Sequence, residues 1–217
     1  MGKKGLGTPT EKLKAYRKDL EDLNKRIVLV NGLPFTGKTA QAIDYAVKDI
    51  KKGFYDKLIL VRSPLQSECG FLKGGYDDKM APYTRQASIY CERSNEGMTL
   101  DEMIAVGVCE VMEPMFLQGN RFDRCVVIVD EAQNIHKDWA FKVLTRVGAG
   151  TKFVIIGDVS KGQENKRIKI ENSLPYYLVA KLREKPYVGI HTFYEESDIL
   201  GGEVEKDLIL TLMDDFC

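Results

Sequence analysis

Long apolar stretches are absent from this chain of 217 residues, and no hydrophobic run approaches the roughly 20 residues that a membrane-spanning helix needs. The first residues, Met1-Gly-Lys-Lys-Gly, lead into no apolar segment of the kind found in a secretory signal. Position 6 is leucine, where N-myristoylation requires serine or threonine. The sequence therefore predicts that this protein has no membrane partner.

Cysteine and histidine are also scarce. The five cysteines are widely spaced, at Cys69, Cys91, Cys109, Cys125 and Cys217, and they form no C-x-x-C pair. An odd number of scattered thiols favours reduced cysteines in a cytoplasmic protein over a disulfide framework. His136 and His191 are the only histidines, so the chain offers no pattern typical of a zinc site.

Excess charge of either sign is missing, because lysine plus arginine and aspartate plus glutamate each total 32 and the net charge is zero. A balanced chain carries no global electrostatic footprint for nucleic acid, although a local basic patch is compatible with it. Basic residues do gather between positions 12 and 26, but acidic residues are interleaved with them. That pattern favours a solvated helix face.

What the sequence does contain is an alternation of apolar, β-branched runs with segments of helical periodicity. Strands are predicted at 26–31, 57–62, 108–112, 125–130, 151–158 and 187–193. Helices are predicted at 8–24, 40–50, 82–91, 99–106, 138–147, 173–184 and 203–214. This alternation predicts an α/β fold with a mostly parallel sheet of five or slightly more strands and helices on both faces.

Local signals define the two terminal helices. Thr8 is the predicted N-cap of the first, with Pro9 in the first helical position and Glu11 three residues after the cap. The apolar face of this helix would consist of Leu13, Tyr16, Leu20 and Leu23. In the C-terminal helix we expect burial of Val204, Leu208, Ile209 and Leu212.

The stretch around which the chain is organised runs from Arg26 to Ile50. A β-branched strand leads into Gly-Leu-Pro-Phe-Thr-Gly-Lys-Thr, and an amphipathic helix follows. This is the G-x-x-x-x-G-K-T pattern of a phosphate-binding loop in its required strand–loop–helix context. Because Gly32 and Gly37 lack a Cβ, the backbone can turn tightly and direct its N–H groups at an anion beside the helix N-terminus.

Residues of this loop are candidates for nucleotide binding and catalysis. Lys38 would reach the β- and γ-phosphates, and the Thr39 hydroxyl would bind Mg²⁺. The predicted nucleotide-binding residues are Gly32, Leu33, Pro34, Phe35, Thr36, Gly37, Lys38, Thr39 and Ala40, joined by Asp158 and Gln163 from a later segment.

A second element, of the Walker B type, ends the apolar strand 125–130. A carboxylate at the carboxyl end of a parallel strand lies beside the phosphate loop, so Asp130 would hold the Mg²⁺. Glu131 would then orient or deprotonate an attacking water. Asp158 ends another strand at the same edge, and its carboxylate or Gln163 would sense the γ-phosphate. A simple turn is the alternative for Asp158.

These motifs together resemble one family. Asp130-Glu-Ala-Gln-Asn134 with the phosphate loop is similar to the PhoH-like ATPases, relatives of the helicase superfamily 1 nucleotide-binding domain. Further similar segments are Arg62-Ser-Pro64, Gly70-Phe-Leu-Lys-Gly-Gly75, Lys79-Met-Ala-Pro82-Tyr83, Thr145-Arg-Val-Gly148 and Gly157-Asp158. The likeness is close over about 26–158 and looser over 172–198. The stretch 70–83 is its most specific part, because generic phosphate-loop proteins lack it.

The resemblance implies a RecA-like P-loop core that binds and hydrolyses ATP with Mg²⁺. It also implies a homo-oligomer, such as a hexameric ring, with a helicase-like role on RNA or single-stranded nucleic acid. We accordingly divide the chain into an N-terminal tail and helix at 1–24 and a single ATPase domain at 25–217. An irregular, family-specific insertion is expected at about 65–122 within that domain.

Three departures from the family pattern bear on activity. No glutamine precedes Gln41, whereas relatives carry one upstream that is thought to read adenine. Lys161 stands where relatives have a glutamine after Gly-Asp, and Gly201-Gly202 where they have Arg-His. A charge-stabilising arginine is worth about 10³–10⁵ in rate, so this chain is a weak ATPase unless another arginine substitutes.

Three arginines are candidates for that role: Arg62, Arg121 and Arg146. We expect Arg146, after the helix that follows the Walker B strand, to act on the nucleotide of a neighbouring subunit. Arg62 ends a strand at the nucleotide edge of the sheet and is also the candidate contact for a nucleic-acid phosphate. A surface salt bridge is the alternative for both.

Two other functions stay open at this stage. The departures would suit a switch or scaffold that binds ATP with negligible turnover. A small-molecule kinase would need a lid with several arginines, which Arg85, Arg93, Arg121 and Arg124 could supply. The resemblance over 70–83 argues against the kinase.

Overall fold

The computed structural model of this chain describes residues 10–62, 85, 87–92, 99–160 and 167–214. At its centre lies one sheet of six parallel strands in the order β3-β2-β4-β5-β1-β6. The strands are β1 (Ile27–Gly32), β2 (Lys57–Arg62), β3 (Cys109–Met112), β4 (Cys125–Asp130), β5 (Lys152–Gly157) and β6 (Val188–Phe193). The predicted α/β fold with a mostly parallel sheet is confirmed.

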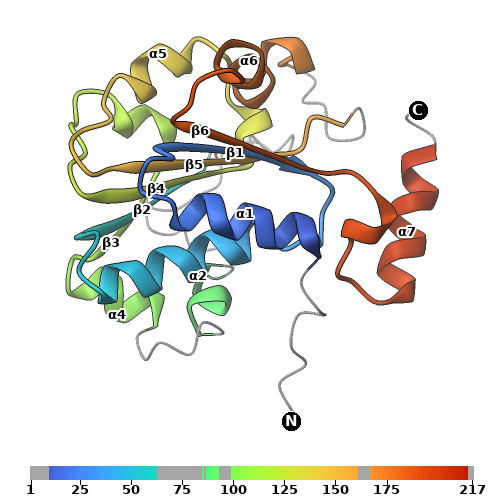
Figure 1. Cartoon of the computed structure of the whole chain (residues 1–217), viewed down its shortest axis with the longest axis horizontal. Coiled ribbons are helices and arrows are strands. Elements are labelled where there is room, and N and C mark those ends of the chain that lie inside the picture. The colour runs from blue at the N-terminus through green and yellow to red at the C-terminus, as the bar shows by residue number, and fades with distance from the viewer. Residues whose placement is uncertain (1–9, 63–84, 86, 93–98, 161–166, 215–217) are drawn as a thin grey trace, which may run out of the picture.

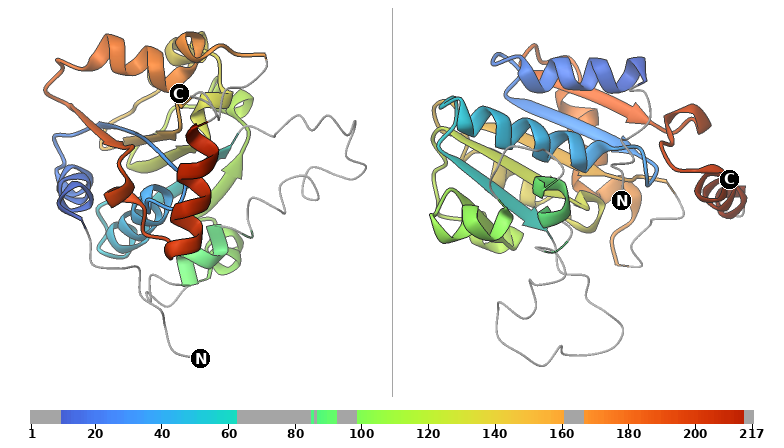
Figure 2. Two further views of the ribbon diagram at one scale, coloured as in Figure 1. Left: turned by 90° about the vertical axis from the view of Figure 1, so that its right-hand side faces the viewer. Right: turned by 90° about the horizontal axis from the view of Figure 1, so that it is seen from below.

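Helices cover both faces of the sheet (Figure 1). One face carries α1 (Glu11–Glu21), α2 (Lys38–Lys51) and α4 (Leu100–Ala105), which lie side by side in the right-hand view of Figure 2. The other face carries α5 (Trp139–Leu144) and α6 (Leu174–Leu182). Short 3-10 helices occur in the connections between these elements, namely η1 (Pro114–Leu117), η2 (Ala132–Asn134), η4 (Ile170–Asn172) and η5 (Glu196–Asp198).

The continuous apolar runs of the central strands follow from this double coverage. In β1, Val28 and Val30 enter the core beneath α1 and α2, whereas Ile27 and Leu29 enter the core beneath α6. Successive side chains of a strand point to opposite faces, so one strand contributes to both cores. Because all six strands are parallel, their carboxyl ends share one edge, and that edge positions the candidate site.

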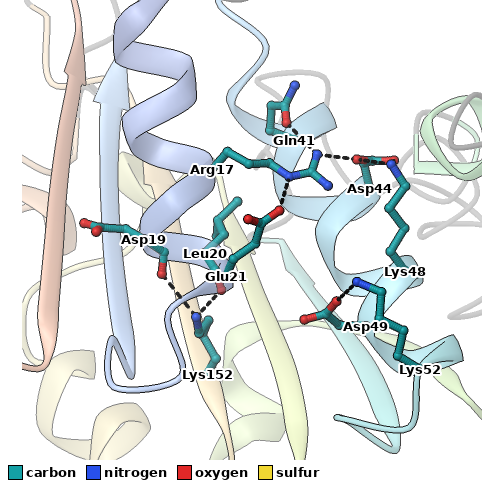
Figure 3. Close-up of polar contacts among 10 residues, drawn as sticks. All are labelled: Arg17, Asp19, Leu20, Glu21, Gln41, Asp44, Lys48, Asp49, Lys52 and Lys152. Carbon is teal, nitrogen blue, oxygen red and sulfur yellow. Dashed lines mark hydrogen bonds and ion pairs between the residues drawn. The ribbon is translucent and has the colours of Figure 1, made fainter.

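Helix α1 is anchored to the same core. Its apolar face consists of the buried residues Leu13, Tyr16 and Leu20. At its C-terminal end the fully buried Lys152 of β5 donates hydrogen bonds to the backbone carbonyls of Asp19 and Leu20 (Figure 3). It donates a third to the carbonyl of Asp22. These contacts satisfy carbonyls that a helix C-terminus leaves without partners, and they place a cation at the negative end of the helix dipole.

The start and the end of α1 differ from the prediction. Thr10, not Thr8, is the N-cap, and its hydroxyl accepts a hydrogen bond from the backbone N–H of Leu13 at 3.2 Å. Two threonines placed two residues apart satisfy the same local signal, so the sequence pattern alone did not choose between them. The helix also ends at Glu21, and Leu23 beyond it is 54% exposed, so its predicted burial was wrong.

The C-terminal helix α7 (Glu203–Asp214) forms as predicted but does not bury the expected face. Val204, Leu208 and Leu212 are 78%, 56% and 53% exposed. Figure 1 and the right-hand view of Figure 2 show α7 standing beyond the carboxyl edge of the sheet, outside the two helical layers. Amphipathic periodicity predicted the helix correctly, but it could not predict a packing partner among the described residues.

Most other elements agree with their predictions. Helix α4 begins with the expected capping box between Thr99 and Glu102. Helix α5 ends at Leu144, three residues before the predicted end, and turns follow it. In the segment predicted as a helix at 82–91, Arg85 and residues 87–92 are helical. Within the described part of the chain, no helix is long and apolar enough to cross a membrane.

Candidate nucleotide site

The phosphate loop connects β1 to α2 with a geometry that requires both glycines. Gly37 has φ 82°, in the left-handed region that strains other residues. A Cβ on Gly32 would overlap the backbone carbonyl of Phe193 in β6. The loop thus delivers its backbone to the N-terminus of α2, which is an anion-binding position.

A pocket of about 240 Å³ lies over this loop. The residues that line it are Gly32, Pro34, Phe35, Thr36, Gly37, Lys38, Thr39, Ala40, Tyr90, Asp130, Glu131, Gln133, Ile156, Gly157 and Asp158. They come from the ends of β1, β4 and β5, which are neighbours in the sheet, and from the helical segment 87–92. The pocket therefore brings the predicted loop and Walker B residues together with Asp158. Leu33, also predicted, is buried behind the loop and does not line the pocket.

The ammonium of Lys38 is held inside the loop. It donates to the carbonyls of Gly32 at 2.7 Å and Leu33 at 2.5 Å, and to the Thr36 hydroxyl at 3.1 Å. Burial lowers the pKa of Lys38 to about 8, opposed by the negative charges of Asp158, Asp130 and Glu131. A desolvated ammonium that is only partly compensated by carbonyl groups is well suited to bind phosphate oxygens.

Thr39 and Asp130 form a pair of oxygen ligands. The Thr39 hydroxyl donates to Asp130 Oδ1 at 3.2 Å, although 91 positions separate the two residues in the chain. Burial and the neighbouring charge of Glu131 raise the pKa of Asp130, while Arg62 and Thr39 oppose this shift. A hydroxyl and a carboxylate at this separation fit Mg²⁺, which prefers hard oxygen ligands and would itself favour the ionised carboxylate.

Gln133 connects the two acidic elements, and sequence analysis assigned it no role. Its amide nitrogen donates to Glu131 Oε2 at 2.7 Å, and its amide oxygen accepts from the backbone N–H of Asp158 at 3.1 Å. The Asp158 carboxylate is buried, with Oδ1 accepting from the backbone of Ser160 at 2.9 Å. In the sequence, only the position of Gln133 within the Asp-Glu-Ala-Gln-Asn stretch could have indicated this role.

Comparison with known proteins assigns the chain to a family. The family model described as PhoH-like protein matches residues 7–211. The chain belongs to this family. The PhoH-like protein of Bacillus subtilis is 33% identical over 136 residues, which make up 62% of this chain and 43% of that protein. Protein PhoH2 of Mycolicibacterium smegmatis is 29% identical over 153 residues, or 69% of this chain and 35% of that protein.

A third relative, Protein PhoH2 of Thermobispora bispora, is 27% identical over 164 residues, covering 74% of this chain and 37% of that protein. This chain thus matches less than half the length of these curated relatives. Membership of the PhoH family, together with the parallel sheet, makes this chain a nucleotide-binding protein of the P-loop NTPase type. The family segments at 63–64 and 70–83 lie outside the described residues, as does Gln163.

The three candidate arginines of this PhoH-like chain are divided between the two edges of the sheet. Arg62 lies at the pocket edge, with Nη1 3.8 Å from Asp130 Oδ2 and Nη2 3.5 Å from Glu131 Oε1. Its side chain is 18% exposed, so it faces these two acids more than solvent. Arg62 and Asp130 are register partners on adjacent strands, which explains the contact.

Arg146 lies at the opposite edge. The turn that contains it is joined to the chain just before the amino end of β4, because the N–H of Phe122 donates to the carbonyl of Arg146 at 3.2 Å. Arg121 is in the same region, with Nε 3.1 Å from Asp123 Oδ2. The structure therefore does not bring Arg146 or Arg121 to the pocket of their own chain.

The lowered pKa of Lys38 predicts how nucleotide affinity depends on pH. Below about pH 8 the ammonium is charged, and the affinity for MgATP is expected to be nearly constant. Above pH 8 the free protein loses this proton while bound phosphate favours it, so affinity falls by up to about tenfold per pH unit. Titration calorimetry from pH 7 to 9.5 measures this. Lys38→Arg, which stays charged, should bind without the pH dependence; an unchanged slope in that variant would contradict the assignment.

Proposed function

We propose that this PhoH-like protein hydrolyses ATP with Mg²⁺ and acts on RNA or single-stranded nucleic acid as a helicase-like homo-oligomeric ring. One observation carries the proposal: Lys38, Thr39, Asp130, Glu131 and Asp158 line a single pocket at the carboxyl edge of a parallel sheet. A cation, a pair of metal-binding oxygens and two further carboxylates are the parts that phosphoryl transfer to water requires.

Each residue has a distinct role in this proposal. Lys38 exchanges the loop carbonyls for oxygens of the β- and γ-phosphates. Thr39 and Asp130 hold Mg²⁺, which neutralises charge on the phosphates. Glu131 orients the attacking water and accepts its proton, and Asp158 senses the γ-phosphate. Gln133 fixes the position of Glu131 relative to Asp158, because its amide contacts the Glu131 carboxylate and the backbone of Asp158.

Ring formation is supported by exposed apolar residues at two ends of the molecule. Val204, Leu208 and Leu212 form an exposed stripe on α7 beyond the carboxyl edge of the sheet. Phe141 on α5 is 79% exposed and precedes Arg146 by five residues. Large exposed apolar side chains are typical of protein contact surfaces. A head-to-tail ring that used both surfaces would carry Arg146 towards a neighbour's pocket.

A nucleotide switch with negligible turnover is the second candidate. Glu131 Oε2 accepts a hydrogen bond from Gln133 at 2.7 Å, and Glu131 Oε1 lies 3.5 Å from Arg62. A carboxylate whose two oxygens already face donors has less freedom to accept a hydrogen bond from an attacking water. In both candidates we place the protein in the cytoplasm, which is supported by the buried free thiols of Cys109 and Cys125.

The purified protein should hydrolyse MgATP, and single-stranded RNA should raise the rate. Phosphate release is measured with and without single-stranded RNA or DNA, and the size of the particle is determined in the same buffer by light scattering. Tight MgATP binding without phosphate release under every condition would favour the switch. A monomeric particle that binds nucleotide would reject the ring.

Replacing Arg146 with alanine should lower turnover at least about tenfold with little change in ATP affinity, because a charge contact made in the transition state is lost. If Arg146 acts on a neighbour, mixing Arg146→Ala with Glu131→Gln protein should restore part of the activity, since mixed rings contain intact interfaces. Arg183→Ala serves as the matched control, because Arg183 is exposed at the C-terminal end of α6 and is not among the residues that line the pocket. Co-assembled mixtures without recovered activity would exclude action across subunits.

A further inference from the structure

A groove of about 270 Å³ runs between α1 and α2, separate from the phosphate pocket. Its lining residues are Leu13, Lys14, Arg17, Lys18, Glu21 and Gln41. It adjoins the phosphate loop, because Leu13 contacts the position where Gly37 would carry a Cβ, at 3.9 Å. Gln41 lies one helical turn beyond Gly37, whose carbonyl accepts the N–H of Gln41 at 3.0 Å. The groove therefore begins about 5 Å along α2 from the loop.

The sheet order decides which end of a nucleotide would face this groove. Asp130, Glu131 and Asp158 follow β4 and β5, which lie on one side of β1. Helix α1 packs on β6, on the other side of β1, and on α2. A triphosphate laid along the loop with its terminal phosphate at the acids must therefore direct its nucleoside towards the α1 side. That is the side on which the groove lies, since α1 supplies most of its lining residues.

The side chains of the groove are already oriented. Arg17 Nη1 donates to Gln41 Oε1 at 3.1 Å and to Asp44 Oδ2 at 2.5 Å, and Arg17 Nε donates to Glu21 at 2.9 Å. Because Arg17 occupies the amide oxygen of Gln41, the amide nitrogen points away from it, as Figure 3 shows. A planar guanidinium, an apolar Leu13 and an outward N–H donor are a suitable surface for a flat heteroaromatic ring.

We propose that the groove between α1 and α2 holds the purine base of the bound nucleotide, with the Gln41 amide nitrogen donating to a ring nitrogen of the base. Arg17 is a positioning residue that fixes the amide and offers its face to the ring. This inference rests on the proposed function, because it assumes that a nucleotide occupies the phosphate loop. It assigns base recognition to a residue within α2 itself.

The test compares two ligands that share the triphosphate and differ in the base: MgATP and magnesium tripolyphosphate. Titration calorimetry gives both dissociation constants for the wild type, Gln41→Ala, Gln41→Glu and a control, Gln118→Ala, whose glutamine is exposed at the end of η1. Gln41→Ala should weaken MgATP about threefold to tenfold, the value of one hydrogen bond, and leave tripolyphosphate binding unchanged. Gln118→Ala should change neither.

Gln41→Glu separates recognition from structure. Glutamate keeps the oxygen that Arg17 contacts but has no N–H donor, so MgATP should lose affinity relative to tripolyphosphate as it does in Gln41→Ala. Recovery of wild-type MgATP binding in Gln41→Glu would reduce Gln41 to a support for Arg17 and overturn the proposal. Equal losses for both ligands, or no loss, would also overturn it, for instance if the base lies on Phe35. In those cases, tripolyphosphate binding by the wild type would still support the phosphate loop as the binding site. A wild type that binds neither ligand would contradict the proposed function as well.

Discussion

Replacing Lys38 with alanine should weaken the binding of MgATP at least about 100-fold. The ammonium is the one cation among the residues that line the described pocket, and it is already desolvated inside the loop. Charge-assisted hydrogen bonds are worth about 1.5–3 kcal/mol each, and contacts with both the β- and γ-phosphates would be lost together. Folding should be preserved, because alanine suits the first turn of α2.

Titration calorimetry with MgATP measures this loss, and thermal unfolding without ligand confirms the fold. Lys51→Ala is the matched control, since Lys51 lies in the last turn of the same helix and is exposed. It should bind like the wild type. Affinity in Lys38→Ala within a few-fold of the wild type would mean that this loop does not bind the terminal phosphates.

Changing Glu131 to glutamine should preserve MgATP binding and reduce turnover by about 10²–10⁴, the range typical of a lost general base. The amide keeps the shape of the side chain, and its oxygen can still accept the hydrogen bond from Gln133. It cannot take a proton from water. Binding and turnover therefore separate at this residue, whereas they fail together at Lys38.

The wild-type rate has to be measured first, because a protein that barely hydrolyses ATP would show no difference. Glu110→Gln provides the control. Glu110 lies on the edge strand β3, pairs with Lys57 of β2 and is not among the residues that line the pocket. Equal turnover in Glu131→Gln and an active wild type would show that Glu131 is not the base. A large loss of MgATP affinity in this variant would instead assign Glu131 to binding.

The order of the strands in the sheet brings residues of the site together that are far apart in the chain. No local sequence pattern reveals this order. Thr39 and Asp130 meet because β4 and β1 are separated only by β5 in the sheet. Gln133 joins Glu131 to Asp158 for the same reason, since η2 follows β4 and Asp158 follows β5. A glutamine within a motif has many possible partners, and only the folded chain selects these two.

The sequence by itself determined the parallel α/β fold, the phosphate loop and the acidic strand end, because these depend on periodicity and on residues that are close in the chain. Tertiary structure decided that Arg62 faces Asp130 and Glu131 and that Arg146 lies at the opposite edge. It also decided that α1 forms part of the core while α7 keeps its apolar stripe exposed. The physical reason is that propensity and amphipathicity act within a helix or strand, whereas burial and charge pairing depend on which distant segment packs against it.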